Sequence, residues 1–494
     1  MSLTAPRSSK QRASIDVPAP DTCPLASLGP ASRTSVVPRP TPALSNAATA
    51  SGHPGAGLEN PERRASSPPA PSSLPSPAEA PDSASPGFDH LDKLNLTFPP
   101  PTKQAQRTML YLIGAAVAIA LLLHRIWAVR QVRYLRVSDC ELKYAHLIKN
   151  PERMTYQEAN EIMHVSQLWD MPWLTTISLS FALFKTYAIP TISKVLCKSR
   201  ELSDPANAAR RAEDTAVTIT EFLRGLDTER GAQALARMNY LHSRYGSLIT
   251  NDDMLYTLSL FIFEPIAFAE KYDWRPMTPL EQESRYVFWR EIGARMGIKN
   301  IPPTREALYL WKEGYAKENY KYSPDNRAVG DATFDVFLRA IPGPFKSFAR
   351  QASIALLDDQ TREAFGYERS PEWIYKFVPA LLIARGWVVG YFLLPRLKTP
   401  KHIETEEIKN DKGEVTAFQR LGFLFEPWYV SPNVGPLGVF GYHFPGVPWH
   451  PEGYEPSRLG PERLRETGVE EVKKNAAEMI AKAKVCPFFA ATTQ

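Results

Sequence analysis

The feature that most constrains this chain is an apolar run from Met109 to Trp127. It reads MLYLIGAAVAIALLLHRIW and carries no charged side chain before Arg125. At 1.5 Å rise per residue, roughly 20 such residues span the ~30 Å hydrocarbon core of a bilayer. Aromatic residues favour the membrane interfaces, where Tyr111 and Trp127 would lie. The run therefore predicts a transmembrane helix over residues 108–128.

Basic residues are distributed unequally around this run. Those that follow it closely are Arg125, Arg130, Arg133 and Arg136. Those that lie close before it are Lys103 and Arg107. Because the cytosolic flank of a membrane helix carries the excess of Lys and Arg, we expect the C-terminal body in the cytosol and the N-terminal arm in the lumen.

Residues 1–107 form an arm rich in Pro, Ser and Ala, with runs such as SSPPAPSSLPSPAEAPDSASP. Its few large apolar side chains cannot offset the entropy lost when a backbone is ordered, so we expect this arm to be disordered. The arm starts without the basic segment and early apolar segment of a secretory signal. Basic residues near the start, Arg7, Lys10 and Arg12, leave a transit peptide as an alternative.

Composition narrows the class of protein. The chain has 494 residues, of which 44% are hydrophobic and 22% charged, enough for one large domain or two beyond the arm. The net charge is +5, and basic residues are interleaved with acidic ones, which argues against a nucleic-acid partner. Cys23, Cys140, Cys197 and Cys486 share no C-x-x-C spacing, so neither a zinc site nor a disulfide framework is expected.

Residues 130–400 show the signals of a mainly α-helical domain, since few stretches alternate apolar and polar residues as strands do. Helix N-termini are predicted at Thr155-x-x-Glu158, Asp204-Pro205, Thr278-x-x-Glu281, Thr304 and Ser370-Pro371-Glu372. Asn251-Asp252-Asp253 predicts a further cap, and Pro265 is expected to kink or end the helix after it.

Residues 401–494 are expected to pack on this helical domain. The run Asn410-Asp411-Lys412-Gly413 predicts a turn between two strand-like segments, and hence a hairpin at 401–424. A strap dense in Pro, Gly and aromatic residues follows, and a last helix is expected from Pro461 to about Lys484.

Two further apolar stretches could enter a membrane. Residues 374–396 read IYKFVPALLIARGWVVGYFLLPR, but Arg385 and Pro379 favour a core helix or an interfacial helix over a second span. The earlier stretch MPWLTTISLSFALFKTYAIPTISKVL is interrupted by Lys185 and Pro190, which favours a buried or membrane-surface helix pair.

His242 is the histidine that lies in a buried-looking pattern. It shares one predicted helical face with Leu235, Met238, Leu241 and Tyr245. Three explanations compete: a core histidine satisfied by a neighbouring carbonyl, a metal or heme ligand, and a general base. The local pattern alone favours the first.

The helix that begins at Asp204-Pro205 carries a second stripe with polar members. Its residues are Arg211, Thr215, Ile219 and Phe222. A buried arginine is costly unless it meets an anion such as a carboxylate or a propionate. Without further information, an arginine that extends from the stripe to solvent is the simpler explanation.

Common catalytic motifs are missing: the sequence has no G-x-S-x-G, no P-loop, no H-E-x-x-H and no G-x-G-x-x-G after a strand. The run ARMNYLHSRYGSLITNDDMLYTLSLFIFEP, with FWREIGARMGI, FALFKTYAIPTISKVL and the closing CPFFA, resembles the fungal mpaB-type ER-bound oxygenases. That family shares its catalytic domain with the bacterial latex-clearing protein, a rubber oxygenase. The resemblance covers roughly residues 130–490 and is close for the fungal group, but much looser for the bacterial one.

The resemblance implies a globin-like helical domain that holds heme b and uses dioxygen to cleave a carbon–carbon double bond of an isoprenoid chain. In the rubber enzyme a histidine in an L/M-H-x-x-x-R/Y context is the proximal iron ligand, and His242 matches that position. The resemblance therefore favours His242 as the metal ligand over a core histidine.

The rubber enzyme also has an Arg-x-x-Lys-Thr run in its distal pocket. Arg211 and Thr215 keep the arginine and threonine of that run, which would let them contact the cofactor and donate hydrogen bonds to dioxygen. Asp214 stands where the family has the lysine, so the distal side would work differently here. For the base that the family uses, Glu201 is the nearest candidate by spacing.

The resemblance further implies a single-pass protein of the endoplasmic reticulum membrane with a cytosolic catalytic domain. A hydrophobic, isoprenoid-like small molecule would then reach the site from the bilayer. Two alternatives stay open. Asp214 favours a heme-free, membrane-bound binding or scaffold protein, and a heme oxygenase that acts on another unsaturated lipid is the other.

Overall fold

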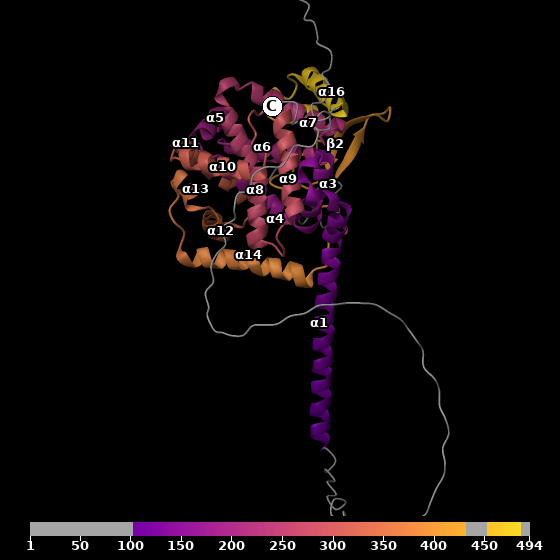
Figure 1. Cartoon of the computed structure of the whole chain (residues 1–494). Helices are drawn as coiled ribbons and strands as arrows, with labels where there is room; N and C mark the ends of the chain where they lie inside the picture. The colour runs from indigo at the N-terminus through magenta and orange to yellow at the C-terminus, as the bar shows by residue number, and fades with distance from the viewer. Residues whose placement is uncertain (1–101, 431–451, 486–494) are drawn as a thin grey trace, which may run out of the picture. The chain divides into compact units, whose positions relative to one another are not determined.

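The computed structural model describes residues 102–430 and 452–485. Most of the arm and of the expected strap lie outside the described residues. The described residues from Ala118 onward belong to one compact unit (Figure 1).

Helices make up most of the described chain, which confirms the expectation of a mainly α-helical body. The helices before the middle of the chain are α1 (Lys103–Lys143), α2 (Ala145–Lys149), α3 (Tyr156–His164), α4 (Pro172–Thr186), α5 (Pro190–Ser199), α6 (Pro205–Leu223), α7 (Glu229–Ser243) and α8 (Asn251–Tyr272). The later ones are α9 (Pro279–Arg295), α10 (Arg305–Asn319), α11 (Pro324–Phe337), α12 (Gly343–Ala355), α13 (Asp359–Ala364), α14 (Glu372–Phe392) and α16 (Val469–Val485). A π-helical segment, Val165–Asp170, connects α3 to α4.

Local capping fixes where several helices begin. The predicted capping side chains that accept a hydrogen bond from a first-turn backbone N–H are Thr155 of α3, Asp204 of α6, Thr278 of α9 and Thr304 of α10. Such bonds satisfy backbone donors that have no partner inside the helix, so they stabilise each start by about 1 kcal/mol.

Two predicted caps differ from the expectation, and at Pro265, where a kink or an end was predicted, the helix does not end. Thr250, and not the Asn251 run, caps α8, because its hydroxyl accepts from the backbone N–H of Asp253 at 3.0 Å. Pro265 does not end α8, which continues to Tyr272 because buried side chains on both sides of the proline hold it against its neighbours. At α14 the hydroxyl of Ser370 donates to a backbone carbonyl of α12 instead of capping.

The core lies between paired helices. The helix α4 packs along α8, and α3 packs along α9, with α8 and α9 side by side in the middle of the unit (Figure 1). The largest apolar cluster contains Ile162, Phe222, Leu235, Ile262 and Phe288, each almost fully buried. Burial of aliphatic and aromatic side chains on this scale is the main stabilising contribution to the fold.

The predicted hairpin at 401–424 is confirmed. Strand β1 (Thr405–Lys409) pairs antiparallel with β2 (Val415–Arg420), and Thr405 lies opposite Arg420. The last helix starts later than predicted: a 3-10 turn (Glu462–Leu464) precedes α16, which begins at Val469. The helix α16 packs on α7 through small residues of both helices.

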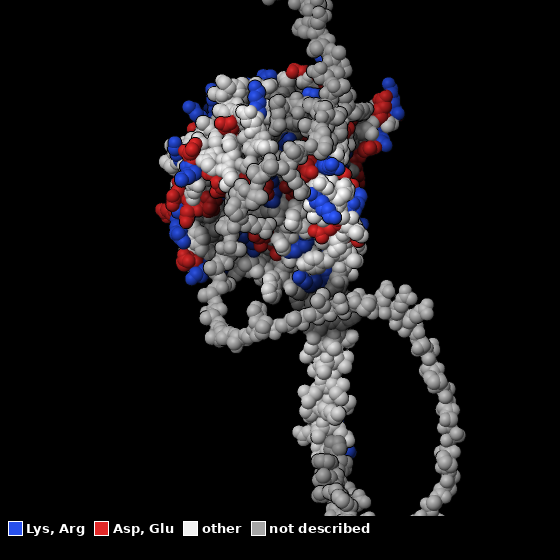
Figure 2. Space-filling model, viewed as in Figure 1, with Lys and Arg blue, Asp and Glu red and all other residues white. Residues whose placement is uncertain are grey.

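Two described helices, α1 and α14, are long and apolar enough to cross a membrane. The expected membrane segment, 108–128, falls within α1, whose side chains there are almost all exposed. Figure 2 shows the lower part of α1 as nearly uncharged, whereas acidic and basic side chains are mixed over the visible face of the body. In α14, Arg385 pairs with Asp273 of the body at 3.2 Å, in line with a core or interfacial helix.

Candidate functional site

A large, partly open cavity lies among the helices of the body. It offers about 350 Å³ to the centres of water-sized spheres, which is in the range of ligand-binding pockets. Its wall is built from α4, α5, α6, α7, α8, α9 and α11, and from short segments near residues 402, 424 and 460. Most of the lining side chains are apolar, and a few polar ones converge on it, as is typical of cofactor and ligand sites.

The tight turn between α6 and α7 brings the two predicted stripes together. At Gly231, near the start of α7, a β-carbon would lie 2.2 Å from the carbonyl oxygen of Gly225, so only glycine permits this approach. Thr228 caps α7 by accepting from the backbone N–H of Gly231 at 3.1 Å. As a result α6 and α7 pack closely and both face the cavity.

His242 lies in the cavity wall near the end of α7. Met238, Leu241 and Tyr245 line the same wall, as the helical face predicted. Within the described residues, Nδ1 of His242 is buried and has no hydrogen-bond partner. Burial, together with the charge of Arg211, lowers the pKa of His242 to about 4, so the imidazole is neutral at pH 7.

A neutral imidazole is the form that binds metals. An ordinary core histidine would have found a carbonyl or carboxylate partner, because a buried unpaired polar atom costs about 1–3 kcal/mol. The unpartnered nitrogen is therefore an observation that favours a ligand role over the core explanation.

Arg211 and Thr215 line the cavity from α6. Nη1 of Arg211 donates to Oγ1 of Thr215 at 2.5 Å, and the Thr215 hydroxyl donates to the carbonyl of Arg211 at 2.9 Å. Among the described residues, no carboxylate forms an ion pair with Arg211, so its charge is not neutralised by the protein. The threonine thus orients the guanidinium, and the guanidinium supplies a cation to the cavity.

Asp214 also lines the cavity and is almost fully buried. Its Oδ1 accepts a hydrogen bond from the hydroxyl of Tyr429 at 2.8 Å. Burial raises the pKa of Asp214 to about 7, although the Tyr429 hydrogen bond and the nearby arginines, Arg210 and Arg211, lower it in part. A carboxyl group of this kind exchanges its proton near neutral pH.

Glu201 lies in the wall too, but its carboxylate pairs with Arg463 at 3.1 Å. This ion pair occupies the group that sequence spacing offered as a base. Asp214 has no such pair with a neighbouring cation and lies one helical turn from Arg211, so it is the stronger candidate.

His402, which the sequence did not single out, is a second imidazole in the wall. Burial, with the charges of Arg420 and Arg396, lowers the pKa of His402 to about 4. Its backbone carbonyl accepts from Arg420 at 2.7 Å, which fixes the segment before β1 against the site. No periodic pattern marks this residue, because it lies in an irregular segment.

Two buried arginine contacts hold the C-terminal segments over the cavity. Arg237 of α7 donates to the carbonyls of Leu459, Leu464 and Thr467 at 2.7–2.8 Å. Arg420 of β2 forms a buried ion pair with Glu213 of α6. The helices that carry His242 and Arg211 thus also hold the C-terminal segments in place.

Among the described residues, no group of three or more His, Cys, Asp or Glu side chains is arranged to hold a metal ion. A heme iron takes most of its ligands from the porphyrin and needs only an axial side chain from the protein. The cavity offers one such side chain, the imidazole of His242.

Comparisons with known proteins identify the family. Residues 153–386 match the model of the catalytic domain of the ER-bound oxygenase mpaB/B′ and rubber oxygenase family. The ER-bound oxygenase mpaB′ of Penicillium brevicompactum is 28% identical over 434 residues, which cover 80% of this chain and 100% of that protein. The ER-bound oxygenase mpaB of Penicillium roqueforti is 30% identical over 266 residues, which cover 51% of this chain and 89% of that protein.

The matched residues include α6, α7 and the helices around them, and hence most of the cavity wall. The fungal resemblance read from the sequence is confirmed, and the expectation of a non-enzymatic scaffold is not supported. The chain belongs to the ER-bound oxygenase mpaB and rubber oxygenase family, and it is an oxygenase.

Proposed function

We propose that this chain is a membrane-anchored, heme-dependent oxygenase that uses dioxygen to cleave a carbon–carbon double bond of an isoprenoid chain. The observation that carries the proposal is the neutral imidazole of His242, which lies in the wall of a large apolar cavity and whose Nδ1 has no partner among the described residues. In this proposal His242 is the residue that would hold heme b through its iron.

The residues around the cavity fit such a group. The volume of about 350 Å³ and the apolar lining suit a flat hydrophobic cofactor and part of a substrate. Among the described residues the guanidinium of Arg211 has no carboxylate partner, and it would suit an anionic group such as a propionate. When bound, heme supplies the redox chemistry that activates dioxygen.

The hydrogen bonds of Arg211 and Thr215 suggest a different role for each residue. The Thr215 hydroxyl proton is already engaged by the carbonyl of Arg211, so Thr215 is a positioning residue. The N–H groups of Arg211 that do not contact Thr215 are the donors that can stabilise negative charge as it develops in the cavity.

Asp214 holds the proton in this proposal. With a pKa near neutrality, its carboxylate can accept an allylic proton from the substrate and return it later. Tyr429 keeps Oδ1 in place through its hydrogen bond, which leaves Oδ2 as the atom that exchanges the proton.

The overall reaction balances without a further reductant. Both bonds of the alkene break, and the two oxygen atoms of dioxygen enter the two new carbonyl groups. The alkene is oxidised and dioxygen is reduced, and the proton taken by Asp214 returns to the products.

The membrane part of the proposal concerns α1. We infer that its apolar run spans the endoplasmic reticulum membrane once, with the arginine-rich end and the body in the cytosol. Two relatives with ER-bound names support the compartment. An isoprenoid chain partitions into the bilayer, so an anchored enzyme meets it at a high local concentration.

An alternative substrate is another unsaturated lipid, such as a fatty acid. The apolar cavity accommodates both classes. Mass spectrometry of the carbonyl products from isoprenoid and fatty acyl alkenes, incubated with the enzyme under oxygen, distinguishes them.

The absorption spectrum of the full chain tests the cofactor. Purified in mild detergent after expression with heme supplied, the protein should show a Soret band. His242→Ala should abolish the band and the bound iron, because the side chain that would hold the iron is lost. The variant His402→Ala, which removes the other imidazole of the same wall, is the matched control and should keep the band.

Two other outcomes would change the proposal. Loss of the Soret band only in His402→Ala would mean that His402, and not His242, binds the heme. A well-folded wild-type protein without a Soret band, as judged by circular dichroism, would contradict heme dependence altogether.

A further inference from the structure

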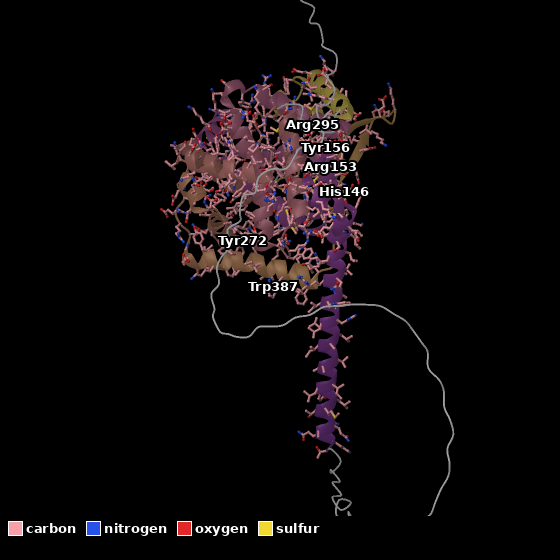
Figure 3. The ribbon with its side chains drawn as sticks, in the orientation of Figure 1. His146, Arg153, Tyr156, Tyr272, Arg295 and Trp387 are labelled. Atoms are coloured by element: carbon pink, nitrogen blue, oxygen red, sulfur yellow. The ribbon has the colours of Figure 1, made fainter. Side chains whose placement is uncertain are left out.

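The outward face of α14 is apolar and exposed. Its buried stripe, formed by Ile374, Val378, Gly386 and Gly390, packs on the body, whereas Trp387 is 65% exposed. In Figure 3, Trp387 points away from the body, while Tyr272 lies on its other side, toward the body.

Further large apolar side chains continue this surface. The exposed residues that define the α14 surface are Phe345 of α12 and Trp373, Phe377, Leu381, Trp387 and Phe392 of α14. Phe348 of α12 bridges the two helices, since its ring stacks on Trp373 at 5.9 Å between centroids. An exposed patch of this extent marks an interaction site, because water solvates it poorly.

The helix is held firmly, so the surface is part of the fold. At Gly386 a β-carbon would lie 2.9 Å from the carbonyl oxygen of Tyr272, and at Gly390 it would lie 3.0 Å from Trp274. Arg385 points inward and pairs with the buried Asp273. These contacts fix the helix on the body and favour a position in the membrane interface over a second span.

The end of α14 contacts α1 directly after its apolar run. Nε of Arg133 donates to the carbonyl of Leu393 at 2.6 Å, and the guanidinium of Arg130 lies 4.7 Å from the ring centre of Tyr391. Arg133 is six residues beyond Trp127, or about 9 Å along a helix. If the run crosses the bilayer, the end of α14 therefore lies at the level of the lipid headgroups.

Charge at this junction suits the same environment. The basic residues with exposed surface there are Arg396 and Lys398, together with the half-buried Arg130 that lies over Tyr391. Basic side chains at the cytosolic edge of a membrane protein attract anionic headgroups, and Trp and Tyr favour the same depth.

We propose that the α14 surface is a second membrane contact, in which α14 lies in the plane of the cytosolic interface with its aromatic side chains among the lipids. Figure 1 shows α14 lying crosswise to α1, with its end beside α1, as a helix in the interface would lie beside a spanning helix. The proposal rests on the membrane span of α1 for its position. It goes further by assigning the exposed face of the body to the bilayer.

Site-specific fluorescence on the full chain tests this contact. The native residues Cys23, Cys140, Cys197 and Cys486 are replaced by alanine, and one cysteine at a time carries a polarity-sensitive dye. The labelled protein is reconstituted in phosphatidylcholine and phosphatidylserine vesicles that contain lipids with a nitroxide either at the headgroup region or near the end of the acyl chain.

The test positions are Trp387→Cys and Phe377→Cys. The control is Leu310→Cys on α10, which is 72% exposed but lies outside the α14 surface. We expect blue-shifted emission and strong quenching by the shallow nitroxide at positions 387 and 377, and little quenching at 310. Equal quenching at all three positions would overturn the proposal.

A reference position separates this proposal from the anchoring by α1. Leu121→Cys, in the apolar run, should be quenched most by the deep nitroxide. If the dye at position 121 alone is not quenched, the proposed span of α1 is wrong. If the dye at 121 is quenched but the dyes at 387 and 377 are not, the α14 contact alone is rejected.

Two other outcomes also reject it. Quenching at 387 by the deep nitroxide as strongly as at 121 would mean a second span. A blue-shifted signal at 387 without any lipid quenching would mean that protein covers this surface, from the same chain or from a second copy.

Discussion

At the scale of single residues, Asp214 links stability to chemistry. An unfolded aspartate ionises near its usual pKa of 3.8, whereas the folded protein keeps this proton until about pH 7. As the pH rises between these values, the unfolded chain loses the proton first, so the free energy of unfolding falls. Above pH 7 the loss is constant and on the order of a few kcal/mol.

Asp214→Asn should therefore raise the thermal midpoint at pH 8 and leave it nearly unchanged at pH 4. An asparagine can still accept from Tyr429, so the hydrogen bond is kept. If Asp214 holds the proton of the reaction, the same variant should retain its heme spectrum but lose most of its turnover number.

The control is Asp335→Asn, an exposed carboxylate on α11. Its midpoint should match that of the wild type at both pH values. A wild-type turnover number in Asp214→Asn would rule out a role in proton transfer, whatever happens to the midpoint.

At the scale of elements, Arg237 joins α7 to the segment before α16. It is 1% exposed and donates to three backbone carbonyls. Arg237→Met should keep much of the volume but leave these carbonyls unpaired. We expect a loss of about 3 kcal/mol or more in stability, since buried hydrogen bonds to a charged group contribute roughly 1.5–3 kcal/mol each.

Limited proteolysis measures this effect directly. New cleavage between residues 453 and 468 should appear in Arg237→Met before the body unfolds. Arg244→Ala, at the end of the same helix, removes an exposed hydrogen bond and a cation–π contact, both to Tyr240, and should cleave like the wild type. Equal protease resistance of the two variants would contradict this role of Arg237.

The sequence predicted the helices and the hairpin better than the contacts between them. Thr155, Thr278 and the turn at Asn410 act on neighbours within a few residues, so their patterns are visible in a single sequence. The inward faces of α6 and α7 were predicted for the same reason, since helical periodicity is local.

The missed features are non-local. His402 lies in an irregular segment, and its place in the cavity depends on Arg420. In the sequence, Asp214 is recognised only as a residue that replaces the family lysine. Its raised pKa follows from its burial beside Tyr429, which the sequence does not reveal. The partners of Arg237 lie more than 200 residues away, at a distance that no local pattern encodes.

At the scale of the whole molecule, the proposed topology predicts a protease pattern. In sealed microsomes, added proteinase K should digest the body and leave a protected fragment that ends near the apolar run of α1. Detergent should remove that protection. A protected body with a digested N-terminal arm would mean that the chain is inserted in the opposite direction.

The cavity described above has walls drawn from Gln167 to Leu464, far apart along the chain. During synthesis α1 leaves the ribosome early, and Leu464 follows roughly tens of seconds later at about 5–20 residues per second. The pocket can close only after that delay. If α1 anchors the nascent chain, the protein reaches its membrane before it has a site, and any cofactor must be loaded there.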